Sequence, residues 1–516
     1  MGYSHEYEAV LDWQQGQYSA RSIVKYQGNI FYAKRSTNQE PGGNDWQHYD
    51  ELYDLTSTTI SGQAKIIAYI PTWRKGEGFD YGNDEIYQYI THGIISFLQF
   101  SETNLGEFTP ESVDQVNAVL SDIVTTGQRN STKISIALGG AGDNGFQTLM
   151  STIGNNPDHQ LLETAVQNVV NFVTDNELDG VDLDLECWEN GGRPSNDPDP
   201  AGSALTFFAQ KLKELMPSKL VSAAVFVTPW YGNNYDPEIV NHLDWLGIMT
   251  YDLTGSWNDS PVGPHSNLFK IYGEDTADIR ERDLYQESYL DEQQGEWLAG
   301  GPANNPISSV EDSIWYWTNP FFTNYQGEGQ QVPRNKIAAG VPIYGYDFAY
   351  GKEPAGASGY KTITYKDILD QFPEANEIPN ANMKVSGSTP RPPFINAQGN
   401  YQFKHNIYFE TPDTAVDKLN FLKSVGTQGV IIWELSQDFW EEDGKSIIKA
   451  LYQNSGNLAK RQPLTPKLGG LRPEIMGKKN NEKKVSNPVV AKIVNIYQRL
   501  QYFIKSALSK DSISNS

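Results

Sequence analysis

The stretch LDGVDLDLE, residues 178–186, decides the fold of this chain. From Asp182 on, carboxylates alternate with apolar residues, which is the period of a β-strand. Such a strand would place Asp182, Asp184 and Glu186 on one face, about 6.6 Å apart in succession at a rise of ~3.3 Å per residue. Like charges in a row on a nearly buried strand are costly unless they share protons or hydrogen bonds. We therefore interpret these acids as functional.

Two other interpretations of the run stay open at this point. It could be an amphipathic edge strand with its acids in water, or a divalent-metal site built from carboxylates. No His lies within or near the run, which speaks against metal. The run also sits mid-chain in an alternating strand and helix pattern, where strands are covered on both faces, and this speaks against an edge strand.

Composition excludes several classes of protein. The chain has 516 residues and a formal net charge of -24, which argues against nucleic acid as the main partner. Aromatic residues make up 12% of the chain, which suits stacking on sugar faces as well as core packing. Cys187 is the single cysteine, so an intrachain disulfide is impossible.

Neither a membrane span nor a leader is visible in the sequence. No run of about 18 apolar residues exists, so we expect no transmembrane segment. The first residues, MGYSHEYEAV, lack the basic, apolar and small-residue order of a signal peptide. The protein is then cytoplasmic, exported by another route, or given without its leader.

The chain from Lys65 to Trp433 alternates strand-like with helix-like segments, which predicts a parallel sheet with crossovers. Strand-like segments lie near residues 65–70, 93–100, 133–138, 178–185, 220–227, 245–250, 336–344 and 428–433. Helix-like segments cover residues 109–125, 160–174, 201–215 and 411–425. Eight such units fit a (β/α)8 TIM barrel, an α/β fold of about 200 to over 400 residues with its chemistry at the carboxyl ends of the strands. Glu186 falls at the end of the fourth strand.

These strand ends resemble a known family. Residues 179–186 match DGxDxDxE, the signature of glycoside hydrolase family 18, the chitinases and their relatives. Residues 249–255, MTYDLTG, are similar to the MxYDxxG run of that family, and Trp433 ends the eighth strand where the family keeps a tryptophan. The resemblance implies the TIM barrel and a glycosidase.

The resemblance also implies roles for single residues. Glu186 would be the general acid and then the base for water. Asp184 would hydrogen-bond the acetamido N–H of the sugar, and Asp182 would share a proton with Asp184. Tyr251 would donate to the acetamido oxygen, and Trp433 would supply an apolar floor. Further substrate contacts are expected from Asp252, Met249, Trp257, Tyr69 and Trp73. No cofactor and no metal are expected.

The sequence departs from the family pattern at two positions. Ala137 stands where the family has a serine whose hydroxyl helps to neutralise the acid that is here Asp182, so Tyr69 would be the remaining partner of Asp182. Ala137→Ser is then expected to move the acidic limb of the pH profile. Tyr346 stands where many members have arginine.

Besides the eight units of the barrel domain, expected at residues 62–455, we predict three further parts, one of them inserted within that domain. Residues 1–55 resemble the small three-stranded chitin-binding modules of bacterial chitinases, but Arg35 and Ser36 take the places of the exposed aromatics; a cap on the barrel is the alternative. Residues 346–405 are expected to form a reduced, loop-like insertion between strands seven and eight. Residues 456–516 carry twelve Lys and Arg against three Asp and Glu, which predicts a basic linker and an amphipathic helix. That helix would pack on the acidic body, on another protein or on a membrane surface.

Taken together, the resemblance implies an extracellular chitinase that hydrolyses β-1,4-linked N-acetylglucosamine polymers with retention. Its ligands would be chitin or chito-oligosaccharides. Three alternatives stay open: an endo-β-N-acetylglucosaminidase acting on N-glycans, a non-catalytic chitin-binding lectin, and a subunit of a larger assembly such as a bacterial insecticidal toxin complex.

Overall fold

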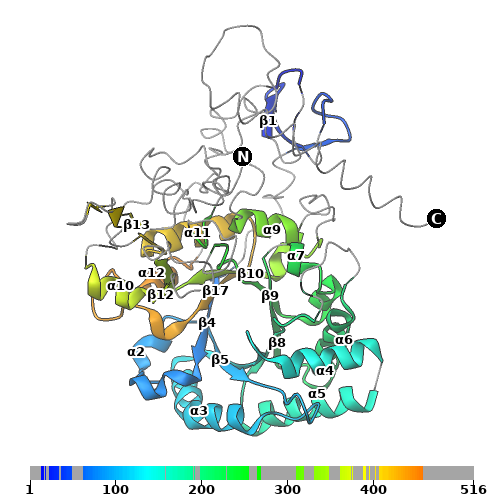
Figure 1. The fold of residues 1–516 in the computed structure, drawn as a ribbon, viewed down its shortest axis with the longest axis vertical. Coiled ribbons are helices and arrows are strands. Elements are labelled where there is room, and N and C mark those ends of the chain that lie inside the picture. The colour runs from blue at the N-terminus through cyan, green and yellow to red at the C-terminus, as the bar shows by residue number, and fades with distance from the viewer. Residues whose placement is uncertain are drawn as a thin grey trace.

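A closed barrel of parallel strands forms the centre of the protein (Figure 1). The structure is a computed structural model, and it describes residues 13–16, 18, 23–33, 37–48, 62–156, 159–189, 191, 198–227, 229–254, 264–268, 309–318, 330–347, 361–373, 375, 388–390, 394–395, 401–402 and 406–456. The barrel strands are β4 (Lys65–Pro71), β5 (His92–Leu98), β6 (Lys133–Gly139), β7 (Gly180–Asp184), β8 (Leu220–Val225), β9 (Trp245–Ile248), β10 (Ile337–Pro342) and β17 (Gly429–Trp433). Strand β17 pairs with both β10 and β4, which closes the ring. The predicted TIM barrel is confirmed.

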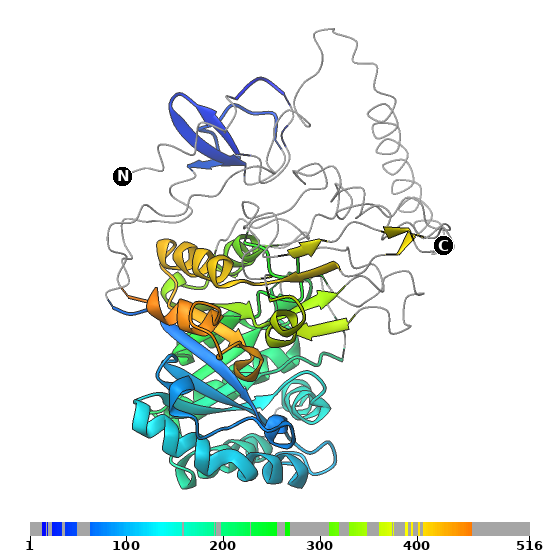
Figure 2. The same cartoon turned by 90° about the vertical axis from the view of Figure 1, so that its left-hand side faces the viewer.

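Helices surround these strands on the outside, as the side view also shows (Figure 2). They are α2 (Asp84–Tyr87), α3 (Pro110–Asn130), α4 (Asn144–Asn155), α5 (His159–Asp175), α6 (Pro200–Leu215), α7 (Pro229–Gly232), α9 (Val310–Thr318), α10 (Tyr365–Gln371), α11 (Pro412–Ser424) and α12 (Ile447–Gln453). Local sequence sets their ends. Helix α3, for example, begins where the Thr109 hydroxyl accepts the Ser112 N–H at 3.3 Å and Pro110 takes the first helical position.

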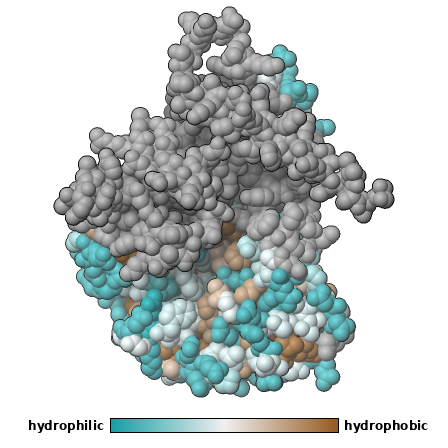
Figure 3. Space-filling view, viewed as in Figure 1, coloured by the Kyte–Doolittle hydropathy of each residue, from teal (hydrophilic) through white to brown (hydrophobic). Residues whose placement is uncertain are grey.

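The main apolar core lies between the strands and the helices. Alternate residues of β7 show this arrangement: Val181 and Leu183 are fully buried in that core, whereas Asp182 and Asp184 belong to the opposite face of the strand, inside the barrel. The described surface in Figure 3 is mostly hydrophilic with smaller apolar patches. In the described ranges no helix is long and apolar enough to cross a bilayer.

An insertion separates β10 from β17. Its strands are β11 (Tyr344–Asp347), β12 (Lys361–Thr364), β13 (Ser388–Pro390), β14 (Phe394–Ile395), β15 (Tyr401–Gln402) and β16 (Asn406–Phe409). Four of them form an antiparallel sheet in the order β12-β11-β16-β13. A reduced, loop-like insertion was expected at residues 346–405, and most of these residues lie outside the described part of the chain, so that expectation stays a prediction. The described residues include the short strands above, of which β11 pairs with β16 about sixty residues later in the chain.

Near the N-terminus, β1 (Ile23–Tyr26), β2 (Asn29–Ala33) and β3 (Trp46–His48) form a three-stranded antiparallel sheet. Its small core includes Tyr18, Phe31 and Trp46. Arg35 and Ser36, and the tail from residue 457 on, lie outside the described residues. The predicted domain boundaries and the predicted C-terminal helix stay predictions.

Candidate active site

Strand β7 carries its acids into the barrel interior. It pairs with β6 on one side and β8 on the other, so it is no edge strand. The side chains of Asp182 and Asp184 are 1% and 3% exposed, and Glu186 follows the strand in a partly exposed position. The alternation in the sequence therefore places two of the three carboxylates in the closed interior and the third at its carboxyl end, where catalytic groups of this fold lie.

Asp182 is held by two hydroxyl groups. The Tyr69 hydroxyl donates to Oδ2 at 2.8 Å, and the Ser222 hydroxyl donates to Oδ1 at 2.5 Å. Burial raises the pKa of Asp182 to about 6, while these two hydrogen bonds act in the opposite direction. Tyr69 was predicted as the remaining partner once Ala137 had replaced serine. That prediction was incomplete, because Ser222 supplies a second hydroxyl from the neighbouring strand.

One oxygen of Asp184 is without a hydrogen bond in the described part of the chain. Its Oδ1 is buried and has no hydrogen-bond partner among the described residues. Burial raises the pKa of Asp184 well above its usual value, and the charges of Glu186 and Asp182 raise it further. A buried acceptor without a partner is costly, and a bound N–H would remove that cost.

Close contact between β6 and β7 positions this part of the site. The Gly140 N–H donates to the Asp184 carbonyl at 2.9 Å. Gly139 has φ +104, and a Cβ there would lie 2.1 Å from the same carbonyl oxygen. Glycine is therefore required at residue 139 for β6 to approach the acid strand so closely.

Glu186 has the proton affinity of an acid that works near neutral pH. Burial raises its pKa to about 7, with the charge of Asp252 as the next cause, and a backbone hydrogen bond from Ala141 lowers it. Nothing in the sequence indicated that Asp252 would affect the pKa of Glu186. The charge of Glu186 is in turn one of the causes that raise the pKa of Asp184.

Aromatic rings gather beside the acids. The Trp433 ring lies 5.6 Å from that of Tyr69 and 6.2 Å from that of Trp73, centroid to centroid. Phe97, which the sequence analysis missed, is stacked on Trp433 at 5.8 Å and on Trp73 at 6.4 Å. Trp73 is 43% exposed. An exposed tryptophan in a fixed stack offers an apolar face to a sugar ring.

The residues after β9 complete the site. Met249 and Tyr251 are each 8% exposed and share one cluster with Tyr69 and Ala137, against which Trp433 packs. All the predicted site residues at these strand ends are thus brought together, except Trp257, which lies outside the described residues.

Asp252 is the most unusual of these residues. Its backbone has φ 55, a left-handed conformation that is uncommon for residues other than glycine. The hydroxyls of Tyr344 and Tyr346 donate to its Oδ1 at 2.5 and 2.9 Å. Burial raises the pKa of Asp252, but hydrogen bonds from the Tyr344 and Tyr346 hydroxyls act in the opposite direction, and the net pKa is lowered. Tyr346, flagged by its departure from arginine, thus acts on Asp252. Nothing in the sequence pointed to Tyr344 or His265 as neighbours of Asp252.

In the part of the chain that the structure describes, no group of three His, Cys, Asp or Glu side chains is arranged to hold a metal ion.

Fold and site together define a TIM-barrel protein with a row of acids that runs along the fourth strand from the barrel interior to its carboxyl end. More narrowly, the chain belongs to the glycosyl hydrolases family 18, whose model matches residues 65–438.

Comparison with individual proteins agrees with this family. "Probable chitinase 10" of Drosophila melanogaster is 22% identical over 427 residues, which cover 79% of this chain but only 16% of that protein. The crystal structure of an Ostrinia furnacalis Group IV chitinase in complex with allosamidin is similar with a TM-score of 0.56 at 17% identity, covering 76% of this chain and 98% of the other. A chitinase-like agglutinin from Robinia pseudoacacia has a TM-score of 0.50 at 18% identity, covering 76% and 99%. This chain is therefore chitinase-like, and its fold is shared by a hydrolase and an agglutinin.

Proposed function

We propose that this protein is a chitinase that hydrolyses β-1,4-linked N-acetylglucosamine chains with retention, by substrate-assisted catalysis. The observation that carries the proposal is the buried Oδ1 of Asp184, which lacks a partner among the described residues beside a glutamic acid whose pKa is raised to about 7. An acceptor of this kind fits the N–H of a 2-acetamido group. A raised pKa fits a general acid at neutral pH.

Glu186 begins the reaction by giving its proton to the glycosidic oxygen as the C1–O bond breaks. The carbonyl oxygen of the sugar's own acetamido group forms a bond to C1 from the opposite face, which yields an oxazolinium ion. Asp184 accepts the acetamido N–H and stabilises the positive charge that develops on that group. Water, deprotonated by Glu186, then opens the ring and restores the β configuration.

Three features support this scheme over one with two flanking carboxyls. The acids follow one strand. In the usual scheme, by contrast, two carboxyl groups lie on opposite sides of the scissile bond, about 5–9.5 Å from each other. Tyr251 lies at the next-but-one strand end and would hold the acetamido oxygen in line with C1. Trp433, stacked on Phe97, would support the sugar at the reacting centre.

The test is hydrolysis of chitotetraose, with the anomer of the product followed by NMR at early times. We expect the β anomer from the wild type and a loss of about 10²–10⁴-fold in rate for Glu186→Gln. Glu189→Gln, an exposed glutamate three residues on, is the matched control and should retain full activity. An N-glycan substrate run in parallel separates chitinase from endo-β-N-acetylglucosaminidase activity. Binding of chitotetraose without hydrolysis would make the protein a sugar-binding member of its family.

A further inference from the structure

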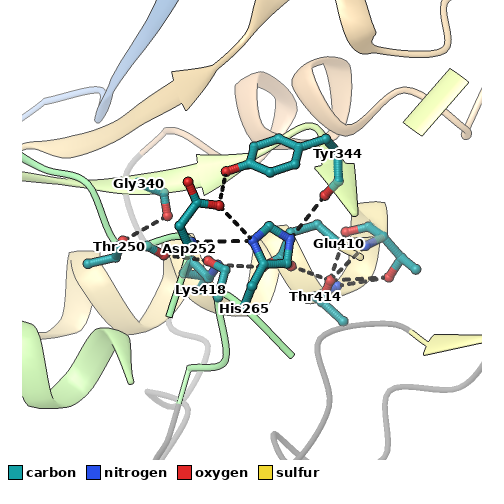
Figure 4. Close-up of polar contacts among 10 residues, drawn as sticks. Thr250, Asp252, His265, Gly340, Tyr344, Glu410, Thr414 and Lys418 are labelled. Atoms are coloured by element: carbon teal, nitrogen blue, oxygen red, sulfur yellow. Dashed lines mark hydrogen bonds and ion pairs between the residues drawn. The ribbon is translucent and has the colours of Figure 1, made fainter. Parts of the chain in front are cut away.

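The five residues Pro264–Leu268 are all buried, and they lie against the turn that carries Tyr251 and Asp252. His265, in this segment, is 2% exposed, and its ring packs against those of Tyr344 and Tyr346 at 4.9 and 5.0 Å. In Figure 4 the imidazole lies between Asp252 and Tyr344. A fully buried histidine this close to a candidate active site calls for a role.

His265 holds two consecutive N–H groups of the turn. The Leu253 N–H donates to the His265 carbonyl at 2.9 Å, and the Asp252 N–H donates to Nδ1 of the ring at 3.4 Å. On the other side of the ring, Nε2 lies 3.1 Å from the Tyr344 carbonyl. A carbonyl can only accept, so Nε2 carries the hydrogen, and in the neutral ring Nδ1 is left as an acceptor. The tautomer follows from the contacts, and it is the one that can receive the Asp252 N–H.

The neighbouring residue anchors this segment to the barrel. The Ser266 hydroxyl donates to the Thr250 carbonyl at 2.5 Å, and the Lys418 ammonium donates to the Ser266 hydroxyl at 2.6 Å. Lys418 also pairs with Glu410, and both side chains are at most 1% exposed. Separating this buried ion pair would leave either charge alone, which is very costly, so the contact holds the segment of Ser266 to α11. Figure 4 shows this chain of contacts from α11 to the end of β9.

We infer that His265 is a positioning residue for the reaction, acting on Tyr251 and Asp252 through the backbone of their turn. The left-handed conformation of Asp252 costs energy, and such a conformation persists only where surrounding contacts impose it. His265 supplies those contacts at Asp252 and Leu253, immediately after Tyr251. The inference rests on the proposed function, because Tyr251 and Asp252 matter for hydrolysis only if the site is catalytic.

The test compares His265→Asn with His265→Leu in the full-length chain. Asparagine can place its side-chain oxygen where Nδ1 lies and still accept the Asp252 N–H, whereas leucine fills the space without an acceptor. Both variants lose the hydrogen bond to the Tyr344 carbonyl, so the difference between them isolates the contact with Asp252. With chitotetraose as substrate, we expect kcat/KM to stay near the wild-type value for asparagine and to fall about 10–100-fold for leucine. The loss should appear more in kcat than in KM, because Tyr251 acts in the transition state.

Hydrogen–deuterium exchange provides a readout that does not depend on activity. A peptide spanning residues 249–254 should exchange faster in His265→Leu than in wild type or His265→Asn, while the thermal unfolding midpoints of the two variants stay similar. Equal kcat/KM and equal exchange in the two variants would overturn the inference. If the wild type hydrolyses no chitin oligomer and yet the exchange rates differ as expected, the proposed function fails and the positioning contact stands.

Discussion

At residue 137 the third barrel strand carries alanine, and the hydroxyl that meets Asp182 comes from the strand on the other side. Ala137 and Ser222 are both register partners of Asp182, one on β6 and one on β8. A hydroxyl at either position can therefore reach the same carboxylate. Ser222 donates the hydrogen bond to Asp182 that the serine replaced by Ala137 would have made. Ala137→Ser alone should therefore change the pH profile little.

Ser222→Ala should move the acidic limb of the kcat/KM profile to higher pH. The Ser222 hydrogen bond lowers the pKa of Asp182, which burial has raised to about 6, so its removal raises that pKa further. Asp182 then keeps the proton that it would share with Asp184 up to a higher pH. We expect a loss of about 1–3 kcal/mol in the free energy of unfolding as well, because a buried carboxylate oxygen loses its donor.

The matched control is the double variant Ser222→Ala with Ala137→Ser, which returns the hydroxyl from the opposite strand. It should bring the acidic limb back toward its wild-type position. A pH profile that is the same in the wild type, Ser222→Ala and the double variant would show that neither hydroxyl tunes Asp182.

At the scale of single residues, the sequence predicts which side chains of one strand share a face. It does not predict which side chains of neighbouring strands contact one another. The alternation of residues 182–186 was enough to place the acids on one face of β7. Ser222, Phe97 and His265 were missed because their roles depend on register and on contacts between strand ends. Ser222 has one sequence signal, a polar residue in the otherwise apolar strand LVSAAV, residues 220–225.

Among the elements, the junction of β16 and α11 anchors the insertion to the barrel. Glu410 directly follows β16, and Lys418 lies one turn beyond the first turn of α11. The Thr414 hydroxyl donates to the second oxygen of Glu410 at 2.5 Å. The pair therefore joins the last strand of the insertion, the helix that leads back to β17, and the segment of Ser266.

Lys418→Met should lower the free energy of unfolding by about 3–5 kcal/mol, because it leaves the buried Glu410 charge without its partner. Chemical denaturation measures the change. Replacing both partners by apolar residues, with Glu410→Leu added, should recover part of the loss.

Lys366→Met is the control for a pair of the same chemistry at the surface. Lys366 pairs with Glu441 at 2.9 Å and with Asp370 at 3.1 Å, and all three side chains are at least 40% exposed. Its loss should cost about 0–1 kcal/mol. If Lys418→Met and Lys366→Met lower the free energy of unfolding by the same amount, the buried pair does not stabilise the junction of β16 and α11.

Elements with a clear period were predictable, and short ones were not. The eight barrel strands and α3, α5, α6 and α11 begin and end within a few residues of the predicted segments, because long apolar or amphipathic runs are strong signals. Helix α4 was missed, and so was the sheet of the insertion. Its strands β11, β12, β13 and β16 are three or four residues long and pair with strands more than ten residues away, so no local pattern in the sequence indicates them.

At the scale of the whole molecule, burial in the closed barrel makes the ionised forms of the acids unfavourable for folding. The pKa of Glu186 rises from 4.5 to about 7, and that of Asp182 from 3.8 to about 6. A carboxyl with a raised pKa favours the folded state below its unfolded value, and this contribution is lost as the pH rises through its folded value. Above pH ~7 both groups therefore oppose folding by their desolvation.

Glu186→Gln should raise the thermal unfolding midpoint at pH 8 and leave it nearly unchanged at pH 4. The amide resembles the protonated acid, so it removes a cost that exists only when Glu186 is ionised. The full pKa shift corresponds to at most about 3 kcal/mol. Glu189→Gln, measured at both pH values, controls for the general relief of net negative charge. A midpoint at pH 8 that is no higher than that of this control would contradict the expectation.

The raised proton affinity of Glu186 means that stability favours the replacement of this glutamate during evolution. If the site hydrolyses chitin as proposed, a gene copy freed from selection for hydrolysis would gain stability above neutral pH from Glu186→Gln, while the aromatic stack and the Asp184 acceptor would still be selected wherever sugar binding is useful. We expect binding proteins to arise from such barrels in few steps and to be more stable than their catalytic ancestors. The return path is uphill, since regaining the acid means accepting its cost again before any activity is recovered.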